Sequence, residues 1–195
     1  KHQPSTVNRQ PSTPIQPITN LIFELAQLRL ESRRGWHRFG IRPENVAEHS
    51  LRAAQIAYIL AVMEKHPNPH YAVTLAVFHD MAESRTGDPD RIAKQYAKTD
   101  QELAVRDQTA GLGSLGASIF EMWQEVEQAE TDAGKIAKDA DRLEMAFTAK
   151  QLMSQGYKGA RKWMESAEKS LKTESAKQLF ESLCDAEPDD WWLAV

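Results

Sequence analysis

The sequence is poor in cysteine and glycine. Its one cysteine among 195 residues, Cys184, excludes an internal disulfide and any zinc site built from several cysteines. None of its nine glycines belongs to a phosphate-binding loop of the Walker or dinucleotide type. The lack of cysteine suits a reducing compartment, so we expect the chain to be cytoplasmic.

Long apolar runs and excess positive charge are also missing. No run approaches the roughly 20 residues that span a bilayer, and no signal-peptide pattern is present. Because the chain begins with Lys1 rather than Met, the removal of an earlier segment stays open. A formal net charge of −4 argues against nucleic acid or an anionic membrane as partner. A small anionic substrate remains compatible with this charge, since a bound cation can reverse the local field.

Period-two alternation of apolar and polar residues is absent as well, so we predict an all-α fold. Residues 1–17 are rich in Pro, Ser, Thr, Gln and Asn and are predicted to form a flexible tail. Residues 18–195 are predicted to form a single helical domain. The helices expected in it cover 18 to about 35, 43 or 44 to 63, 71–84, 91–98, 100–110, 114 or 115 to 128, and 132 to about 155, with two more after 159.

The most informative stretch is the apolar segment that leads into the adjacent pair His79-Asp80. Glu83 follows at a spacing that places it on the same side of a helix as both residues. Asp88 then falls in a Thr-Gly-Asp-Pro turn, where the helix must end. These side chains suit a divalent cation, although a helix end whose His and Asp cap or pair locally is the simpler alternative.

Two other helices offer residues of the same chemistry. His49 lies on an apolar helix face, where a satisfied core histidine is more common than a ligand. Asp141 lies close to the buried stripe of a later helix, whereas Asp139 is expected to face solvent. Two imidazoles and two carboxylates from His49, His79, Asp80 and Asp141 would suit a divalent transition metal with open coordination positions.

A basic loop precedes the helix that carries His49. It contains Arg33, Arg34, Arg38 and Arg42 together with Trp36. Beside acidic ligands such a loop could bind a phosphate group, but the segment alone favours a solvated surface patch.

The segments RRGWHRFGIRPENVAEHS, FHDMAESRTGD and KDADRLEMA together resemble the HD-domain metal-dependent phosphohydrolases, whose signature is H…HD…D. Their order and separation are similar to those of the 5'-deoxyribonucleotidase branch, and the resemblance extends from about Leu21 to Gln155. It implies a helical bundle that binds one divalent metal ion (Co, Mn, Mg, Zn or Fe). The metal ligands that it implies are His49, His79, Asp80 and Asp141.

The resemblance also implies roles for residues around the metal. Glu83 is expected to act on the attacking water, with Asp80 as the other candidate for accepting its proton. Arg33 or Arg34 is expected to orient the phosphate, and Arg33 fits the R-x-G-W form better. The residues expected beside the substrate are Trp36, against the sugar, and Asp88 and Arg91.

Other branches of the superfamily fit less well. The sequence after His79-Asp80 is Met-Ala-Glu-Ser, so the second acid of HDxxED and the Ile-Gly-His of the triphosphohydrolases are both missing, and no Gly-Tyr-Pro occurs. We therefore predict removal of the 5'-phosphate from (deoxy)ribonucleoside monophosphates. A phosphatase or phosphodiesterase for another small phosphorylated metabolite and a non-catalytic metal- or nucleotide-binding module stay as alternatives. The expected partners are a small phosphorylated substrate and a second copy of the chain in a homodimer, with no nucleic acid and no membrane.

Overall fold

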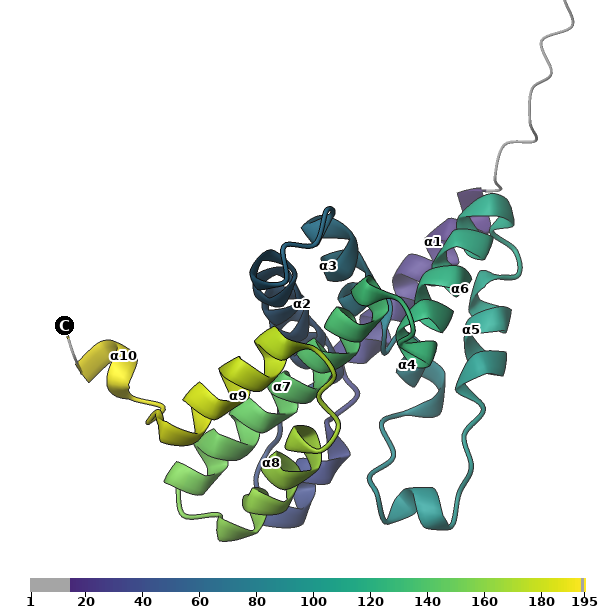
Figure 1. Cartoon of the computed structure of the whole chain (residues 1–195). Coiled ribbons are helices and arrows are strands. Elements are labelled where there is room, and N and C mark those ends of the chain that lie inside the picture. Colours follow the sequence, from purple (N-terminus) through teal and green to yellow (C-terminus); the bar gives the residue numbers. More distant parts are fainter. Residues whose placement is uncertain (1–14, 194) are drawn as a thin grey trace, which may run out of the picture.

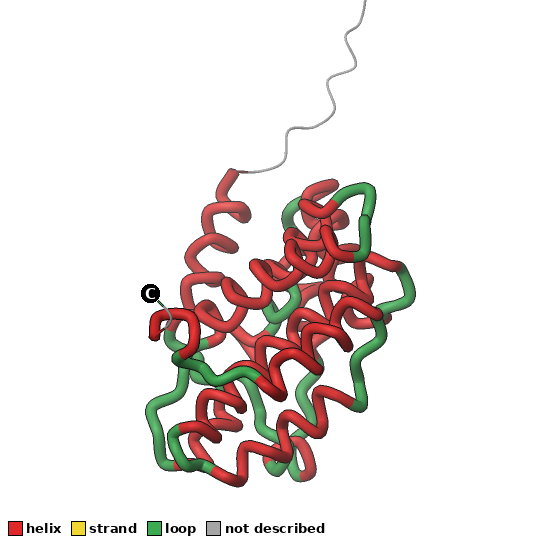
Figure 2. The backbone as a smooth tube through the Cα atoms, turned by 60° about the vertical axis from the view of Figure 1, so that its left-hand side comes forward, coloured by secondary structure: helices red, strands yellow, loops and turns green. Residues whose placement is uncertain are grey.

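The computed structural model describes residues 15–193 and residue 195, and in this part of the chain the fold is all helical (Figures 1 and 2). The only β-type pairing within it is an isolated bridge between Ser32 and Asn45. The predicted all-α fold is therefore confirmed. The α-helices are α1 (Ile15–Leu25), α2 (Val46–Met63), α3 (Pro69–Phe78), α4 (Glu83–Thr86), α5 (Gln101–Thr109), α6 (Gly113–Gln128), α7 (Asp132–Ser154), α8 (Arg161–Glu168), α9 (Glu174–Asp185) and α10 (Asp190–Leu193). The 3-10 helices are η1 (Ala26–Arg29), η2 (Arg34–Phe39), η3 (Ala93–Gln95) and η4 (Lys158–Ala160).

Helix α7 is the centre of the larger core cluster. It packs against α2, α3, α6, α8 and α9, and no other helix contacts as many neighbours. Its buried stripe contains Ile136, Ala140, Leu143 and Ala146, which are at most 1% exposed. Because alanines alternate with larger residues on this stripe, α2 and α3 can approach α7 closely. This approach brings the polar ends of three helices together.

A smaller core cluster joins α1, α5 and α6, which lie together away from α9 and α10 in Figure 1. Leu21, Val105, Leu112 and Ile119 are buried there. Met122 of α6 packs against both clusters and so connects them. No described helix is long and apolar enough to cross a membrane.

Polar caps fix where the central helices begin. The Asn45 side chain accepts a hydrogen bond from the Glu48 backbone, and the Glu48 side chain accepts one from Asn45 in return, which forms a capping box at the start of α2. Thr131 caps α7 by accepting a hydrogen bond from the backbone N of Gly134. These caps set the register of the two helices that carry His49 and Asp141.

Several predicted boundaries were wrong. The first predicted helix, expected to reach about residue 35, ends at Leu25 and continues only as the 3-10 helix η1 to Arg29. Helix α1 starts at Ile15, so residues 15–17 of the predicted tail are helical, while residues 1–14 lie outside the described part. Helix α3 ends at Phe78 instead of continuing to 84, because the His79 ring bonds the Ala76 carbonyl that the next helical N–H would otherwise use. The predicted helix over 91–98 is only the 3-10 turn η3, since its apolar residues Ile92 and Tyr96 are exposed and have no core to pack against.

The expectation that Asp139 faces solvent was also wrong. Its carboxylate is fully buried and accepts hydrogen bonds from the backbone N of Lys172 (3.0 Å) and from both the backbone N (2.7 Å) and Oγ1 (2.8 Å) of Thr173. Asp139 thus fixes the segment between α8 and α9 to α7. The helical period identified one buried face of α7, but a segment more than 30 residues away in sequence covers a second one.

Removal of this carboxylate should destabilise the fold. We expect Asp139→Ala to lower the free energy of unfolding by about 2–4 kcal/mol, because the backbone N–H groups of Lys172 and Thr173 lose a buried, charged acceptor. Urea unfolding of the metal-free chain measures the change. The same substitution at the exposed Asp185 is the control, and an equally small change in both variants would contradict this role.

Candidate metal centre

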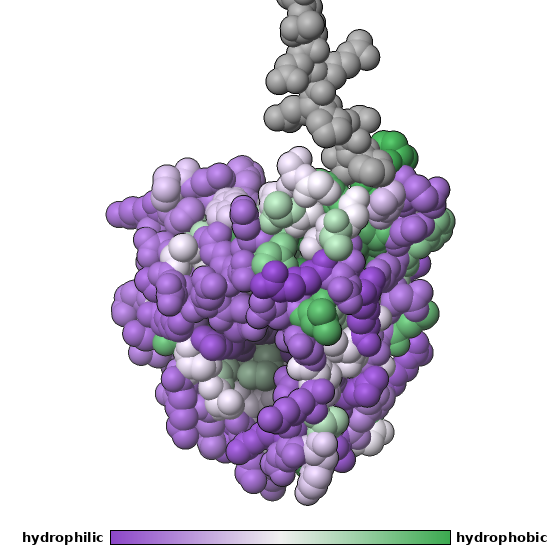
Figure 3. All heavy atoms as spheres, turned by 90° about the vertical axis from the view of Figure 1, so that its right-hand side faces the viewer, coloured by the Kyte–Doolittle hydropathy of each residue, from purple (hydrophilic) through white to green (hydrophobic). Residues whose placement is uncertain are grey.

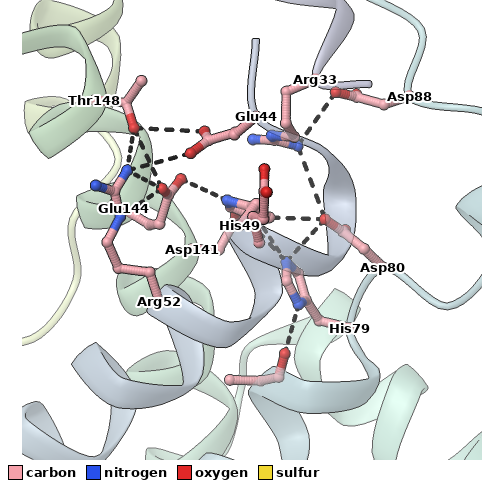
Figure 4. Close-up of polar contacts among 12 residues, drawn as sticks. Arg33, Glu44, His49, Arg52, His79, Asp80, Asp88, Asp141, Glu144 and Thr148 are labelled. Atoms are coloured by element: carbon pink, nitrogen blue, oxygen red, sulfur yellow. Dashed lines mark hydrogen bonds and ion pairs between the residues drawn. The ribbon is translucent and has the colours of Figure 1, made fainter. Parts of the chain in front are cut away.

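Four side chains converge where α2, α7 and the end of α3 meet (Figure 4). Nε2 of His49 lies 3.2 Å from Nε2 of His79. The same His49 atom lies 3.4 Å from Oδ2 of Asp80 and 3.3 Å from Oδ1 of Asp141. Nε2 of His79 lies 3.0 Å and 3.8 Å from these two carboxylate oxygens. All four predicted metal ligands are therefore brought together.

The hydrogen bonds on the outer side of the two rings explain why the centre suits a cation. Nδ1 of His79 lies 2.7 Å from the Ala76 carbonyl oxygen, and Nδ1 of His49 lies 2.5 Å from Oε2 of Glu144. Since both partners are acceptors, each Nδ1 carries the proton, and a neutral ring then directs its Nε2 lone pair inward. The inward side also holds Oδ2 of Asp80, which is buried and, apart from its contacts with the two imidazoles, has no hydrogen-bond partner among the described residues.

The spacing of these donors matches one small divalent ion. Ligands about 2.1 Å from a common ion are separated by about 3.0–3.4 Å in tetrahedral or octahedral geometry. The separations given above lie close to this range. One possible ligand atom from each of His49, His79 and Asp141 lies within 4.8 Å of the other two. The residues present therefore fit a divalent cation.

The electrostatics of the centre point the same way. Burial lowers the pKa of His79, but Asp80 and Asp141 outweigh it and raise this pKa to about 10. Burial raises the pKa of Asp141, and the two imidazoles then hold it well below its usual range. The four groups together attract positive charge, which protons supply when no metal ion is bound.

Metal removal should therefore lower thermal stability. An ion that binds only the folded chain stabilises it by about 2.7 kcal/mol at a free concentration 100 times Kd. We expect Zn²⁺, Co²⁺ or Mn²⁺ to raise the melting temperature of the stripped protein. Ca²⁺, which prefers six to eight oxygen ligands, should raise it less. Thermal unfolding monitored by circular dichroism measures this, and no shift with any of the transition metals would argue against the centre.

A second acidic group lies behind His49 but is already neutralised. Glu44 and Glu144 approach His49 closely enough to resemble a metal site. However, the Arg52 guanidinium lies between them. Its Nε donates a hydrogen bond to Oε1 of Glu144 at 2.8 Å, and its Nη2 contacts Glu144 and Thr148. The same Nη2 lies 3.5 Å from Oε2 of Glu44. Glu144 was not among the residues predicted for the site. Its position could have identified it, because Glu144 follows Asp141 by three residues and lies next to Leu143, which is buried.

Glu83 begins α4 at the edge of the centre. Its side chain is 5% exposed, and Oε2 has no hydrogen-bond partner among the described residues. Burial and the carboxylates of Asp80 and Asp88 raise the pKa of Glu83 to about 9, while Arg33 opposes them. A divalent cation nearby would also lower this pKa and favour the carboxylate form.

The structure distinguishes the two candidate arginines. Nη1 of Arg33 lies 3.3 Å from Oδ2 of Asp88 and 3.8 Å from Oδ2 of Asp80, and its side chain is 13% exposed. The Arg34 side chain is 52% exposed and its Nε pairs with Glu31 at 2.9 Å. Arg33 therefore faces the candidate metal ligands together with Asp88, whereas Arg34 does not.

The structure says less about two other predicted substrate contacts, Trp36 and Arg91. Trp36 is 3% exposed, and its ring packs against Trp163 (5.3 Å between centroids) and Phe39 (6.3 Å). These contacts match ordinary loop packing, so contact with a sugar stays a prediction. Arg91 is exposed, and no side-chain hydrogen bond or ion pair of Arg91 occurs within residues 15–193.

The surface on the side of α5 and α6 is concave (Figure 3). This face is mostly hydrophilic, and a hollow opens in its lower half, lined in part by less polar residues. Concave surfaces of this kind are the usual places for small-molecule sites.

Comparison with known proteins identifies the family. A model of the HD domain matches residues 25–183. The 5'-deoxynucleotidase HDDC2 of Dictyostelium discoideum is 31% identical over 134 residues, which are 63% of this chain and 70% of that protein. The human protein of that name is 33% identical over 132 residues, 65% of this chain and slightly under two thirds (64%) of the relative. A conserved hypothetical protein from Pyrococcus furiosus has a TM-score of 0.72 and 27% identity, covering 86% of this chain and 99% of that structure. The chain belongs to the HD domain family.

Proposed function

We propose that the chain is a metal-dependent phosphohydrolase that removes the 5'-phosphate from (deoxy)ribonucleoside monophosphates. The observation that carries this proposal is the convergence of four side chains, in which one carboxylate oxygen each of Asp80 and Asp141 lies within 3.0–3.8 Å of Nε2 of both His49 and His79. Beside them lie a buried carboxyl group, Glu83, and a largely buried arginine, Arg33. The names of the relatives support nucleoside monophosphates as the substrate class.

In this reaction the metal ion and the side chains around it would have different roles. His49, His79, Asp80 and Asp141 would hold a divalent ion, whose positive charge would polarise a phosphoryl oxygen and make a nearby water more acidic. Which of Co, Mn, Mg, Zn or Fe serves in the cell stays open, since a mixed nitrogen and oxygen set accepts several of them. The mixed set does disfavour Ca²⁺, which prefers oxygen alone.

The chain's own residues would then act on water and phosphate. Water attacks phosphorus, the bond from phosphorus to O5' breaks, and the products are inorganic phosphate and a nucleoside whose O5' has gained a proton. Glu83 is the better acceptor for the proton of the water, because Oδ2 of Asp80 faces the imidazoles. Arg33, held by Asp88, neutralises charge on the phosphoryl oxygens as the transition state forms.

The substrate panel is the direct test of this proposal. Protein stripped of metal and resupplied with cobalt, manganese, magnesium or zinc would be given deoxy- and ribonucleoside 5'-monophosphates, a triphosphate and a phosphodiester. We expect release of phosphate from the monophosphates, fastest from the deoxy forms if Trp36 excludes a 2'-hydroxyl. Release only from other substrates would overturn the substrate class, and bound metal without any turnover would favour a non-catalytic module. The homodimer and the cytoplasmic location remain predictions.

A single substitution separates proton transfer from metal binding. We expect Glu83→Gln to lower kcat by about 10²–10⁴-fold, the usual contribution of a general base, with metal affinity changed by no more than a few fold. Phosphate release and metal titration on the same preparation measure both quantities. The exposed Glu181→Gln is the matched control. A kcat close to wild type would remove Glu83 from the mechanism.

A further inference from the structure

The side of His49 that faces away from the metal ligands is occupied by a chain of polar groups, of which Glu144 is fully buried (Figure 4). Oε2 of Glu144, a residue with no exposed surface, lies 2.5 Å from Nδ1 of His49. Its other oxygen, Oε1, accepts a hydrogen bond from Nε of Arg52 at 2.8 Å and further contacts from Nη2 of Arg52 and Oγ1 of Thr148. Both carboxylate oxygens of Glu144 are thus engaged, one by the imidazole and one by the guanidinium.

A fully buried carboxylate is costly unless it is paired, and within the described residues the hydrogen bonds to this one come from these partners. Arg52 is itself held by several groups, since its Nη1 also lies 3.3 Å from Oε1 of Gln151. Glu144 lies three residues after Asp141 on α7, so one face of this helix carries both a predicted metal ligand and the partner of a second one.

The two histidines are oriented by different means. His79 donates its Nδ1 proton to a backbone carbonyl, that of Ala76, which no substitution of a side chain removes. His49 depends on a side chain for the same purpose. Carboxylates in this position fix the tautomer of a metal-binding imidazole and raise its basicity.

We propose that Glu144 is a positioning residue for His49, and that Arg52 holds Glu144 in place. The pair keeps the proton of His49 on Nδ1 and its Nε2 lone pair directed toward His79 and the two aspartates. The inference rests on the metal site of the proposed function but not on any substrate. Its consequence is that metal affinity depends on two residues that do not contact the metal.

Glu144→Gln is the first test, because it keeps the shape of the side chain and removes its charge. We expect the affinity for Zn²⁺ or Co²⁺ to fall by about 10–100-fold, the usual cost of losing such a partner. Competition with a chelator of known affinity measures it on the whole 195-residue chain. The visible absorption of the Co²⁺-loaded protein should also change, which a purely structural effect far from the metal would not cause.

Arg52→Met is the second variant and leaves Glu144 itself intact. We expect a smaller loss of metal affinity, of less than about 10-fold. In the double variant the loss of affinity should be less than the product of the two single losses, because both residues act through one carboxylate. Gln151→Met is the matched control: it removes another partner of Arg52 without touching Glu144 and should leave metal affinity within twofold of wild type.

The outcomes are distinct. A folded Glu144→Gln protein that binds metal as tightly as wild type would overturn the inference, even if the enzyme hydrolyses nucleotides as proposed. If that variant does not fold, the nitrogen chemical shifts of the imidazoles in metal-loaded wild type decide, and a His49 without a proton on Nδ1 would overturn it. Normal metal binding by wild type without turnover would remove the proposed function and leave this inference standing.

Discussion

Asp141→Asn is expected to reduce metal-dependent phosphate release by roughly a thousandfold or more, because the charge of a bound metal ion provides several kcal/mol of transition-state stabilisation. Asp141 supplies one of two carboxylates at the centre, and its Oδ1 lies 3.3 Å from Nε2 of His49. Its neutral replacement leaves two imidazoles and a single carboxylate. Phosphate release at saturating substrate, with metal content measured on the same sample, would detect both losses.

The control for this experiment is Asp185→Asn, an identical substitution on the exposed surface of α9. It should leave both metal content and phosphate release unchanged. A folded Asp141→Asn protein that keeps its metal and its activity would show that the ion, if present, is held elsewhere. A protein that keeps the metal but loses activity would assign Asp141 to the reaction rather than to metal binding.

The second large effect on kcat is expected at Arg33 and not at the adjacent Arg34. We expect Arg33→Met to lower kcat by about 10²–10³-fold, the usual effect of removing a positioned donor from the developing charge. Arg34→Met should change it by less than about twofold, because this side chain is half exposed and pairs only with Glu31 among the described residues. Steady-state kinetics on a deoxynucleoside monophosphate would compare the two variants directly.

Loss of Arg33 also removes the ion pair with Asp88 (3.3 Å) and a longer one with Asp80 (3.8 Å), so stability must be followed separately. Arg33→Lys keeps the charge but not the forked geometry, and we expect an intermediate kcat. Urea unfolding of all three variants separates a catalytic effect from a loss of folded protein. Equal losses in the Arg33→Met and Arg34→Met variants would contradict the assignment.

Much of the candidate centre could be predicted from the sequence because its residues interrupt regular patterns. His79 and Asp80 follow an apolar run, and Asp141 lies close to the buried stripe of α7. Such interruptions are costly unless the polar groups have partners, and therefore they point to a site. The resemblance to the HD family united three distant segments that periodicity alone could not connect, and the family match over residues 25–183 confirms it.

The remaining features depend on contacts between elements far apart in sequence. The burial of Asp139 is due to the segment at Lys172 and Thr173, and no local pattern shows that this segment returns to α7. Similarly, Arg52 and Glu144 are separated by 92 positions, so their pairing follows only from the packing of α2 on α7. The choice between Arg33 and Arg34 needed the orientation of η2, which two adjacent arginines in a loop do not determine.

The ends of the helices were misjudged for a related reason. An uninterrupted helical pattern through residues 71–84 did not show that the His79 side chain competes with the backbone for the Ala76 carbonyl. As a result, residues 79–82 form turns, and Asp80 and Glu83 lie on different elements. The centre is assembled around this break rather than along one continuous helix.

In the mechanism proposed here, one divalent ion, held by His49, His79, Asp80 and Asp141, makes this chain a nucleotide phosphohydrolase. The most direct test is to strip the protein of metal, add Co²⁺ back in steps, and follow phosphate release from a deoxynucleoside 5'-monophosphate together with the bound metal. We expect no release at the start and a rise that stops at about one ion per chain. Undiminished release from the metal-free protein, or full occupancy without release, would contradict it.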